Sequence, residues 1–483
     1  MNRYDPSVAK LCFERYAEVL SAATVLILAS YAYRHSWFQV EDILHFDNWR
    51  QLGPWAALQV PIDAYRLPLH QLCSGLFYQV FGLHFGSAEL LLTALLGVDI
   101  WAMNRVLKKL GVARLWRAWA ILFLSTNVYY LDLLTWWSAA LHRLPFIGLS
   151  LWACSTWLDF RGGRRPAYLG LSLLAFLLAL GFYAKAILIP GLLVLLELTL
   201  KRLDRQAQRP VLLPLLALLG LDLLDIAASL YWPVSAGLHI VISTATPRIV
   251  WVAVQHSIAA FLPWTAHLTR IPHNAAEALS IFADSMIGCT RSRQGLFALL
   301  VLAAGSLLAR RKPATAPALQ AALVWLVVNA ILISISVQIG RFGGGPVLLD
   351  RYYFEVIPGT LIFLALAVQA CCPEPGGIRP VWLLGVGLFA LILAVSAIKV
   401  ALQEYQRTTY PLYNTTAQVL PQVLRQVSSA PARCFQDQVL PEFFVPKIYG
   451  SQLNWSIVLD LLPQPPQLAQ RADCQRLKVT PAP

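Results

Sequence analysis

Apolar segments long enough to cross a membrane recur along most of this 483-residue chain. Hydrophobic residues make up 58% of it and charged residues 13%, whereas an ordinary soluble domain carries roughly 25% charged residues. A helix needs about 20 apolar residues to span the hydrocarbon core of a bilayer. Eleven runs approach that length: 17–36, 86–106, 115–134, 138–159, 167–183, 186–200, 211–231, 295–309, 317–339, 352–371 and 380–400. The sequence therefore predicts an all-α polytopic membrane protein with about 11 transmembrane helices.

Basic residues gather on every second segment between these runs. The clusters are Arg3, Lys10 and Arg15; Lys108, Lys109, Arg114 and Arg117; Arg161, Arg164 and Arg165; Lys201, Arg202, Arg205 and Arg209; and Arg310, Arg311 and Lys312. Cytoplasmic loops carry the Lys and Arg excess, so we expect an integral inner (plasma) membrane protein with a cytoplasmic N-terminus and a periplasmic or extracytoplasmic C-terminus. Much of the net charge of +13 is then an orientation signal, and it gives no reason to expect a nucleic-acid partner.

This topology divides the chain into a transmembrane domain over 1–400 and a small extracytoplasmic C-terminal region over 401–483. The transmembrane domain carries two long outer loops, 37–85 and 232–294. Within the second loop, 249–268 is nearly long enough to span, but the basic clusters on both sides of the loop must lie on the same face. We therefore expect 249–268 to form an amphipathic helix at the outer interface.

The cysteines and the N-terminal run complete this outline. Cys434 and Cys474 in the C-terminal region would face an oxidising compartment, and we predict a disulfide between them, with Cys289 as the competing partner. The other cysteines lack metal-ligand spacing. The first run is preceded by Asp5 and Glu14 and has no clean cleavage site after it, so we expect it to be retained rather than removed as a signal peptide.

Three carboxylates, Glu41, Asp42 and Asp47, stand just after the first run, in "FQVEDILHFDNW" (38–49). Acidic residues favour helix N-termini, so capping of a surface helix is one interpretation. Catalysis gives another, because transfer of a group to a hydroxyl needs a carboxylate that removes its proton. When the leaving group is a phosphate, the transfer also needs positive charge that stabilises it, and that cation must lie on the same face of the membrane as the carboxylate.

Four later stretches lie in order on the same predicted face. They are 65–92, which begins "YRLPLH"; 136–153, which begins "WWSAALHRLP"; 180–197, which contains "FYAKAILIP"; and 348–364, which begins "LLDRYYFEVIP". Together with the acidic pair they resemble the GT-C superfamily of polyprenyl-phosphate-sugar glycosyltransferases. The likeness is greatest to the branch with the protein O-mannosyltransferases and their bacterial relatives, and it covers about 35 to 365.

The resemblance is carried by short motifs. In that branch an acidic pair follows the first span, where this chain has Glu41-Asp42. "YRLPL" is similar to the family's "YRPL" with one extra residue. Lys185 and Pro190 match a Lys-Glu…Pro segment of the family. This chain has Ala186 at the position of the glutamate, so the role of that glutamate is absent here or is supplied by another residue. Asp350-Arg351-Tyr352-Tyr353 with Pro358 is similar to a late Glu-Arg-x-x-Tyr-x-Pro segment.

The resemblance implies a general base in the acidic pair. The family places the base at the first position, here Glu41, but Asp is the usual residue for the task and Asp42 supplies it one step along. We rank the two together with Asp42 marginally ahead, and we expect Asp47 to be a loop or helix cap.

A donor-phosphate site is expected among the outer cations. Arg351 ranks first, because a guanidinium presents a fork that matches phosphate geometry. Lys185, Arg143 and Arg66 follow. The alternative for each is contact with lipid headgroups by snorkelling. His142, Tyr352 and Tyr65 are further candidates that lie beside these cations.

These observations predict a membrane glycosyltransferase that moves a sugar from a polyprenyl-phosphate-linked donor to a glycan or protein acceptor on the outer face, with inversion. We expect no metal site formed by Cys or His clusters and no cofactor apart from the lipid-linked donor, and a divalent metal requirement stays open.

The alternative is a transporter or flippase of a lipid-linked substrate, and a non-catalytic scaffold of the same fold is a third hypothesis. Asp222 and Asp225 within 211–231, and Asp99 within 86–106, support the transporter, because ionisable groups at membrane depth are often functional. Buried polar pairing between helices is the other interpretation of these acids.

Overall fold

The computed structural model describes residues 6–33, 36–60, 67–125, 133, 136–163, 165–191, 193, 220, 246–259, 293–311, 316–334, 354–371, 395, 411–428, 434–436, 456–462 and 468–469. Within these ranges the regular structure is helical apart from one pair of two-residue strands. The expected helical architecture is confirmed at this level.

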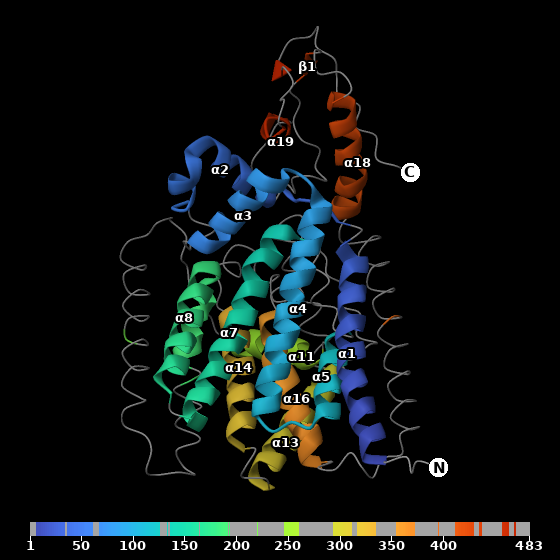
Figure 1. The fold of residues 1–483 in the computed structure, drawn as a ribbon, viewed down its shortest axis with the longest axis vertical. Helices are drawn as coiled ribbons and strands as arrows, with labels where there is room; N and C mark the ends of the chain where they lie inside the picture. Colours follow the sequence, from blue (N-terminus) through green and yellow to red (C-terminus); the bar gives the residue numbers. More distant parts are fainter. Residues whose placement is uncertain are drawn as a thin grey trace.

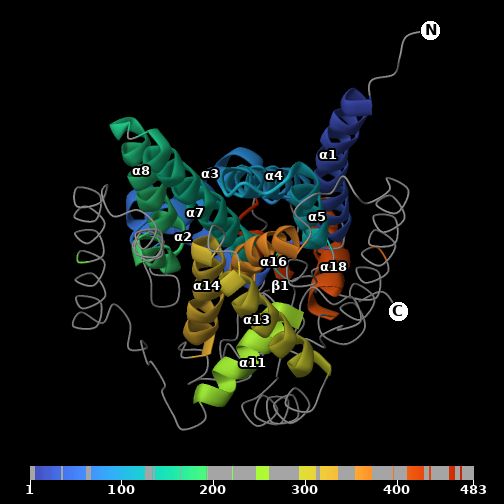
Figure 2. The same cartoon turned by 90° about the horizontal axis from the view of Figure 1, so that it is seen from below.

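Long helices run side by side along the length of the molecule (Figure 1). They are α1 (Pro6–Tyr33), α4 (Phe85–Lys109), α5 (Arg114–Ser125), α7 (Trp137–Gly163), α8 (Pro166–Phe182), α13 (Arg293–Arg311), α14 (Ala316–Ser334) and α16 (Ile357–Cys371). Each covers much of a run that the sequence marks as apolar. Seen along the bundle, α16 lies in the centre, between an arc of α1, α5, α4, α7 and α8 and a group formed by α11, α13 and α14 (Figure 2).

Two helices in the described part, Phe85–Lys109 and Phe354–Cys371, are long and apolar enough to cross a membrane. Four shorter apolar helices, Tyr16–Tyr31, Pro166–Phe182, Ala298–Leu308 and Ala316–Ile331, accompany them. The predicted spans 211–231 and 380–400 lie almost entirely outside the described residues. The count of about 11 spans and the orientation of the termini therefore stay predictions.

Helix α4 shows how local sequence sets the ends of these helices. Its N-terminus is capped by His84, whose ring accepts a hydrogen bond of 3.2 Å from the backbone N of Ser87. Its last turn carries Lys108 and Lys109, and cations are favourable at a helix C-terminus. Beyond it Gly111 takes a φ of 77°, a left-handed conformation that glycine adopts without a steric penalty.

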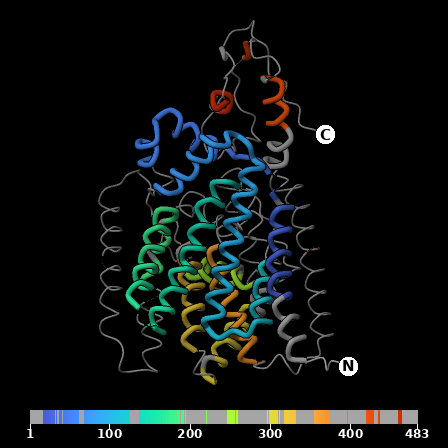
Figure 3. The backbone as a smooth tube through the Cα atoms, in the orientation of Figure 1, coloured from blue at the N-terminus to red at the C-terminus, as the bar shows by residue number. Residues whose placement is uncertain are grey.

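Two helices lie across one end of the bundle: α2 (Val40–Ala57) and α3 (Pro68–Phe81) (Figures 1 and 3). Buried aromatic rings hold them to the start of α7. Phe38 lies 5.2 Å from Phe46 and 6.1 Å from Trp137, and Phe77 lies 4.4 Å from Trp137, between ring centroids. Since such aromatic pairs add to the free energy of area burial, this cluster positions α2 over the bundle end.

The C-terminal region lies beyond this layer. Helix α18 (Pro411–Ser428), helix α19 (Ser456–Leu459) and the parallel strands β1 (Phe435–Gln436) and β2 (Leu468–Ala469) form it. Tyr78 of α3 donates a hydrogen bond of 2.7 Å to the carbonyl of Leu461. Helix α1 begins at the opposite end of the molecule (Figure 1).

Cys434 is disulfide-bonded. The predicted partner, Cys474, and the competing Cys289 lie outside the described residues. The pairing of β1 with β2 brings the chain next to Cys434 beside Leu468 and Ala469, shortly before Cys474, which supports the predicted pair.

Helix α11 (Thr246–Ala259) covers part of the stretch expected to lie at the outer interface. It packs against α13 and α14, and it buries Ile249, Val252 and Ala253. The side chains that it buries make it part of the protein core, and its position relative to a membrane stays a prediction.

Candidate functional site

Asp42 is fully buried in the first turn of α2. Its Oδ2 accepts a hydrogen bond of 2.6 Å from the backbone N of Gln39, which forms a capping box. Its Oδ1 accepts a hydrogen bond of 2.7 Å from the backbone N of Ser138, at the start of α7. The capping interpretation is therefore correct for Asp42, and the same carboxylate also joins two helices that are far apart in sequence.

The electrostatic surroundings of Asp42 suit proton transfer. Burial raises the pKa of Asp42 well above its usual value, and the amides of Gln39 and Ser138 counteract part of this rise. The neighbouring charge of Glu41 raises the pKa further. A carboxylate whose pKa is moved towards neutrality is better matched to the task of a general base.

The other two acids of the cluster are placed differently. Glu41 is partly exposed, and as an immediate neighbour of Asp42 it points to a different part of the helix surface. Asp47 accepts a hydrogen bond of 2.7 Å from Gln51 and lies 3.6 Å from Arg50. Both partners of Asp47 are exposed residues of its own helix, as expected for a residue that stabilises the helix surface.

Two of the predicted cations meet at one carboxylate, Glu355. It lies in the turn Phe354–Val356 that leads into α16 and is fully buried. Arg143 of α7 donates a hydrogen bond of 3.0 Å from Nε to Glu355 Oε1. Lys185, in the short 3-10 helix η1 (Ala184–Ile187), donates from Nζ to Oε2. The ring of Tyr183 lies 5.4 Å from the Arg143 guanidinium and 5.6 Å from Lys185 Nζ, and such contacts stabilise cations.

A row of imidazoles joins Asp42 to these cations. His45 of α2 lies 5.1 Å from His70 of α3, and His70 lies 5.6 Å from His142 of α7, between ring centroids. His142 stacks on Tyr183 at 4.9 Å. His70 Nε2 lies 3.3 Å from Ser138 Oγ, next to the amide that binds Asp42. The carboxylate and the cations are therefore parts of one continuous polar site at the end of the bundle.

The histidines of α2 and α3 are neutral at physiological pH. Burial lowers the pKa of His45 to about 4, and it lowers the pKa of His70 well below its usual value. Within the described residues, the Nδ1 atoms of His45, His70 and His142 have no hydrogen-bond partner. A neutral imidazole offers one donor and one acceptor, so this row can bind hydroxyl groups without adding charge.

The structure brings together five of the residues that the sequence singles out: Glu41, Asp42, His142, Arg143 and Lys185. Four others, Tyr65, Arg66, Arg351 and Tyr352, lie outside the described residues, and their roles stay predictions. Glu355 directly follows the segment that contains Arg351 and Tyr352.

Sequence reasoning missed Glu355, His45, His70 and Tyr183. Glu355 is the one charged residue in the run 352–371, and ionisable residues within such runs are often functional, which was an available signal. The expected acid next to Lys185 is replaced by Ala186, which is fully buried. Glu355 supplies a carboxylate to Lys185 from another helix.

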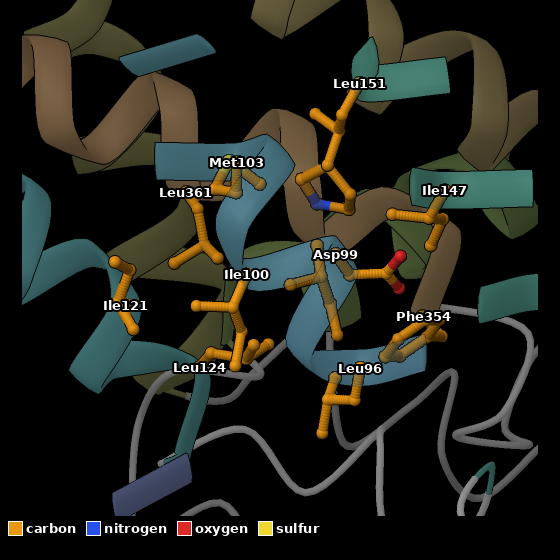
Figure 4. A pocket seen from close by; sticks show the side chains of 12 residues that line it. Leu96, Asp99, Ile100, Met103, Ile121, Leu124, Ile147, Leu151, Phe354 and Leu361 are labelled. Atoms are coloured by element: carbon orange, nitrogen blue, oxygen red, sulfur yellow. The ribbon is translucent and has the colours of Figure 1, made fainter. Parts of the chain in front are cut away.

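Among the described residues, no group of three or more His, Cys, Asp or Glu side chains is arranged to hold a metal ion. Asp99 lies deeper in the bundle and lines a small pocket of about 30 Å³ between α4, α5, α7 and α16 (Figure 4). Apart from Asp99 this pocket is lined by apolar side chains, and Asp99 Oδ2 has no partner in the described part of the chain. Asp222 and Asp225 lie outside the described residues.

Comparison with solved structures finds 11 similar chains, which include the following two. The first is the arabinofuranosyltransferase AftD from Mycobacteria, with a TM-score of 0.44 and 16% identity over 88% of this chain and 30% of that chain. This chain thus spans less than a third of the length of AftD. The second is ArnT from Cupriavidus metallidurans bound to undecaprenyl phosphate, with a TM-score of 0.41 and 15% identity over 94% of this chain and 86% of that chain.

No protein-family model matches the chain, and no curated protein sequence matches it. Both similarities lie below a TM-score of 0.5 and below 25% identity.

Proposed function

We propose that this protein is a glycosyltransferase of the inner membrane that transfers a sugar from a polyprenyl-phosphate-linked donor to a glycan or protein acceptor on the outer face. The observation that carries the proposal is the joining of a buried carboxylate, Asp42, to a pair of cations, Arg143 and Lys185, by a row of imidazoles. A base and a phosphate site at the two ends of one polar site are what this transfer requires.

The chemistry assigns one task to each end. Asp42 takes the proton of the acceptor hydroxyl, because a carboxylate has more acceptor positions than the backbone bonds from Gln39 and Ser138 and the side-chain bond from Trp136 occupy. The acceptor oxygen forms its bond to the anomeric carbon while the bond from that carbon to the phosphate oxygen breaks. Attack from the face opposite the phosphate inverts the anomeric centre.

The departing polyprenyl phosphate gains negative charge in this step, and Arg143 and Lys185 stabilise it. Arg351, four residues before Glu355 in the sequence, is proposed as a further phosphate ligand. The lipid tail of the donor stays in the bilayer beside the bundle, which fits cations at the ends of the long helices.

Glu41 is the second candidate for the base, because it is adjacent to Asp42 and partly exposed. Single amide substitutions separate the two, since Asp42→Asn and Glu41→Gln keep side-chain size and remove the proton acceptor. The experiment compares the surface glycans and glycoproteins of a host that carries the parent chain with those of hosts that carry each variant, by mass spectrometry. The base is the residue whose amide variant loses the modification while membrane insertion is retained.

The transporter alternative rests on Asp99, a buried carboxyl at the wall of an apolar pocket inside the bundle. The purified protein in lipid nanodiscs distinguishes the two functions. A glycosyltransferase consumes lipid-linked donor when acceptor is added, whereas a transporter leaves the donor chemically unchanged.

A further inference from the structure

Glu355 is anchored on one helix and reaches two others. Its backbone carbonyl accepts a hydrogen bond of 2.9 Å from Trp325 Nε1 of α14. A Cβ on Gly359, one turn later, would lie 2.5 Å from the same indole ring, so α16 is held close to α14 here. From this fixed backbone the carboxylate contacts Arg143 of α7 and Lys185 of η1.

We propose that Glu355 is a positioning residue that holds Arg143 and Lys185 side by side and keeps the Lys185 amine in its charged form, so that both cations receive the donor phosphate. The identity of the anion that arrives rests on the proposed function. The effect of Glu355 on the charge of Lys185 does not depend on that identity, because it is argued from the contact between the two side chains.

The groups around Lys185 show why its charged form needs a neighbouring carboxylate. Burial lowers the pKa of Lys185, and the positive charge of Arg143 lowers it further. Glu355 is the carboxylate that opposes both effects. The other titratable groups of the described residues that line this part of the site are the imidazoles of His142 on α7 and His70 on α3, and Tyr183 at the N-terminal end of η1. None of these three supplies an anion at neutral pH.

The charges also balance when the donor is present. Among the described residues, two cations and one carboxylate give the cluster a single positive charge, and a sugar linked to a polyprenyl phosphate is a singly charged phosphodiester. The loaded cluster is then neutral, which keeps the cost of burying its charges low. When the sugar leaves, the phosphate becomes a monoester with an additional negative charge, and the two cations are already in place to stabilise it.

The first test measures the charge of Lys185 without any lipid donor. A membrane-permeable acetylating reagent modifies only neutral amines, and labelling of each lysine is followed by mass spectrometry as a function of pH in the protein in lipid nanodiscs. Lys109 is the internal control, because it is 20% exposed against 19% for Lys185 and pairs with Asp159, far from Glu355.

In Glu355→Gln we expect Lys185 to be labelled at least about tenfold faster than in the parent near pH 8, since each unit of pKa is a tenfold change in the neutral fraction, while Lys109 keeps its rate. Glu355→Asp keeps the charge and should keep slow labelling. Equal Lys185 labelling in the parent and Glu355→Gln would overturn the proposal. So would labelling in Glu355→Asp as fast as in Glu355→Gln, or a rise at Lys109 that matches the rise at Lys185, because the cause would then be loss of folding.

The second test uses polyprenyl phosphate as the ligand, at pH values between about 7.5 and 9.5, where a phosphate monoester is already fully charged. We expect the affinity of Glu355→Gln to fall by up to about tenfold per pH unit over this interval, while the parent changes little. Adding Lys185→Arg to Glu355→Gln should abolish the pH dependence, because a guanidinium stays protonated.

The two proposals fail separately. If the parent binds no polyprenyl phosphate but Glu355→Gln speeds the labelling of Lys185, the proposed function is wrong and the action of Glu355 on Lys185 stands. If the parent binds the lipid, and Glu355→Gln binds it with the same pH dependence with or without the added Lys185→Arg substitution, Glu355 does not keep Lys185 charged. This inference is then wrong.

Discussion

The backbone amide of Ser138 donates a hydrogen bond of 2.7 Å to Asp42 Oδ1, across 96 positions of sequence. This bond joins the first turn of α7 to the first turn of α2. The hydroxyl of the same serine lies 3.3 Å from His70, which begins the row towards Arg143 and Lys185. The position of the proposed base is therefore coupled to the helix that carries one of the proposed phosphate ligands.

The packing of α2 against α3 depends on a glycine of α3, Gly75. A Cβ on Gly75 would lie 2.0 Å from the Trp49 ring, so Gly75→Ala forces the indole out of its packing. Such overpacking typically costs about 1–3 kcal/mol of stability, and thermal unfolding of the purified protein measures it. Gly162→Ala is the matched control, because nothing lies within 4 Å of its Cβ position. Equal unfolding temperatures for the two variants would contradict the packing of α2 on α3.

Protonation of His45 should destabilise the fold at low pH. Its pKa is about 4 in the folded protein and about 6.5 in an unfolded chain, so the unfolded chain binds the proton first as pH falls. The contribution of His45 to the free energy of unfolding does not change above about pH 6.5. Below that pH it falls progressively down to about pH 4, by roughly 3 kcal/mol in total.

The measurement for His45 is the difference in stability between the parent and His45→Asn at each pH. This difference removes the opposite contribution of Asp42, whose raised pKa makes the folded state bind its proton first. The parent should lose stability relative to His45→Asn between about pH 6.5 and 4. Parallel curves over that interval would show that His45 is not held neutral by burial.

The contribution of Arg143 should depend on its fork and not only on its charge. Arg143→Lys keeps a cation but loses the Nε contact with Glu355 and the guanidinium contact with the Tyr183 ring. We expect binding of polyprenyl phosphate to weaken by about tenfold, since a hydrogen bond to a charged group contributes roughly 1.5–3 kcal/mol. Arg50→Lys, on the surface of α2, is the control and should bind as the parent does. Unchanged binding in Arg143→Lys would remove Arg143 from the phosphate site.

Cys434 should be paired with Cys474. Non-reducing peptide mapping is expected to recover one linked fragment that contains both residues, and Cys434→Ser should free the thiol of Cys474. Closure of a loop of about 40 residues stabilises a domain by roughly 3–4 kcal/mol in the chain-entropy model, so the variant should also unfold at a lower temperature. A fragment that links Cys434 to Cys289 would show that the competing pair is the correct one.

The sequence was sufficient for the positions of many of the described helices. Apolar runs predicted the positions of α1, α4, α7 and α8 to within about a turn, apart from the N-terminal end of α1, because a helix in a bilayer needs that length. Asp42 and Lys185 were singled out by their place in the motifs that resemble GT-C glycosyltransferases, and their roles stay predictions.

The remaining part of the site depends on which helices are neighbours. Lys185 and Glu355 are 170 positions apart, and nothing in the local pattern of either segment states that η1 meets the start of α16. The imidazole row has the same origin, because His45, His70 and His142 come from three helices and each alone is an ordinary residue at a helix end. Pattern and residue type predict single elements, whereas contacts between distant elements follow from packing.

The most direct test of the account is the rate of sugar transfer by Asp42→Asn in lipid nanodiscs, with lipid-linked donor and acceptor isolated from a host that carries the parent chain. Loss of a positioned base typically lowers the rate by about 10²–10⁴-fold, and we predict a loss of this size with polyprenyl phosphate binding close to that of the parent. Asparagine keeps one of the two oxygens that accept the backbone amides of Gln39 and Ser138, so we expect a lower unfolding temperature, and the rate is measured at a temperature where the variant is folded. Glu41→Gln, measured in parallel, should retain more of the parental rate than Asp42→Asn. Transfer at the parental rate by Asp42→Asn, with the fold intact, would contradict the assignment of Asp42 as the base.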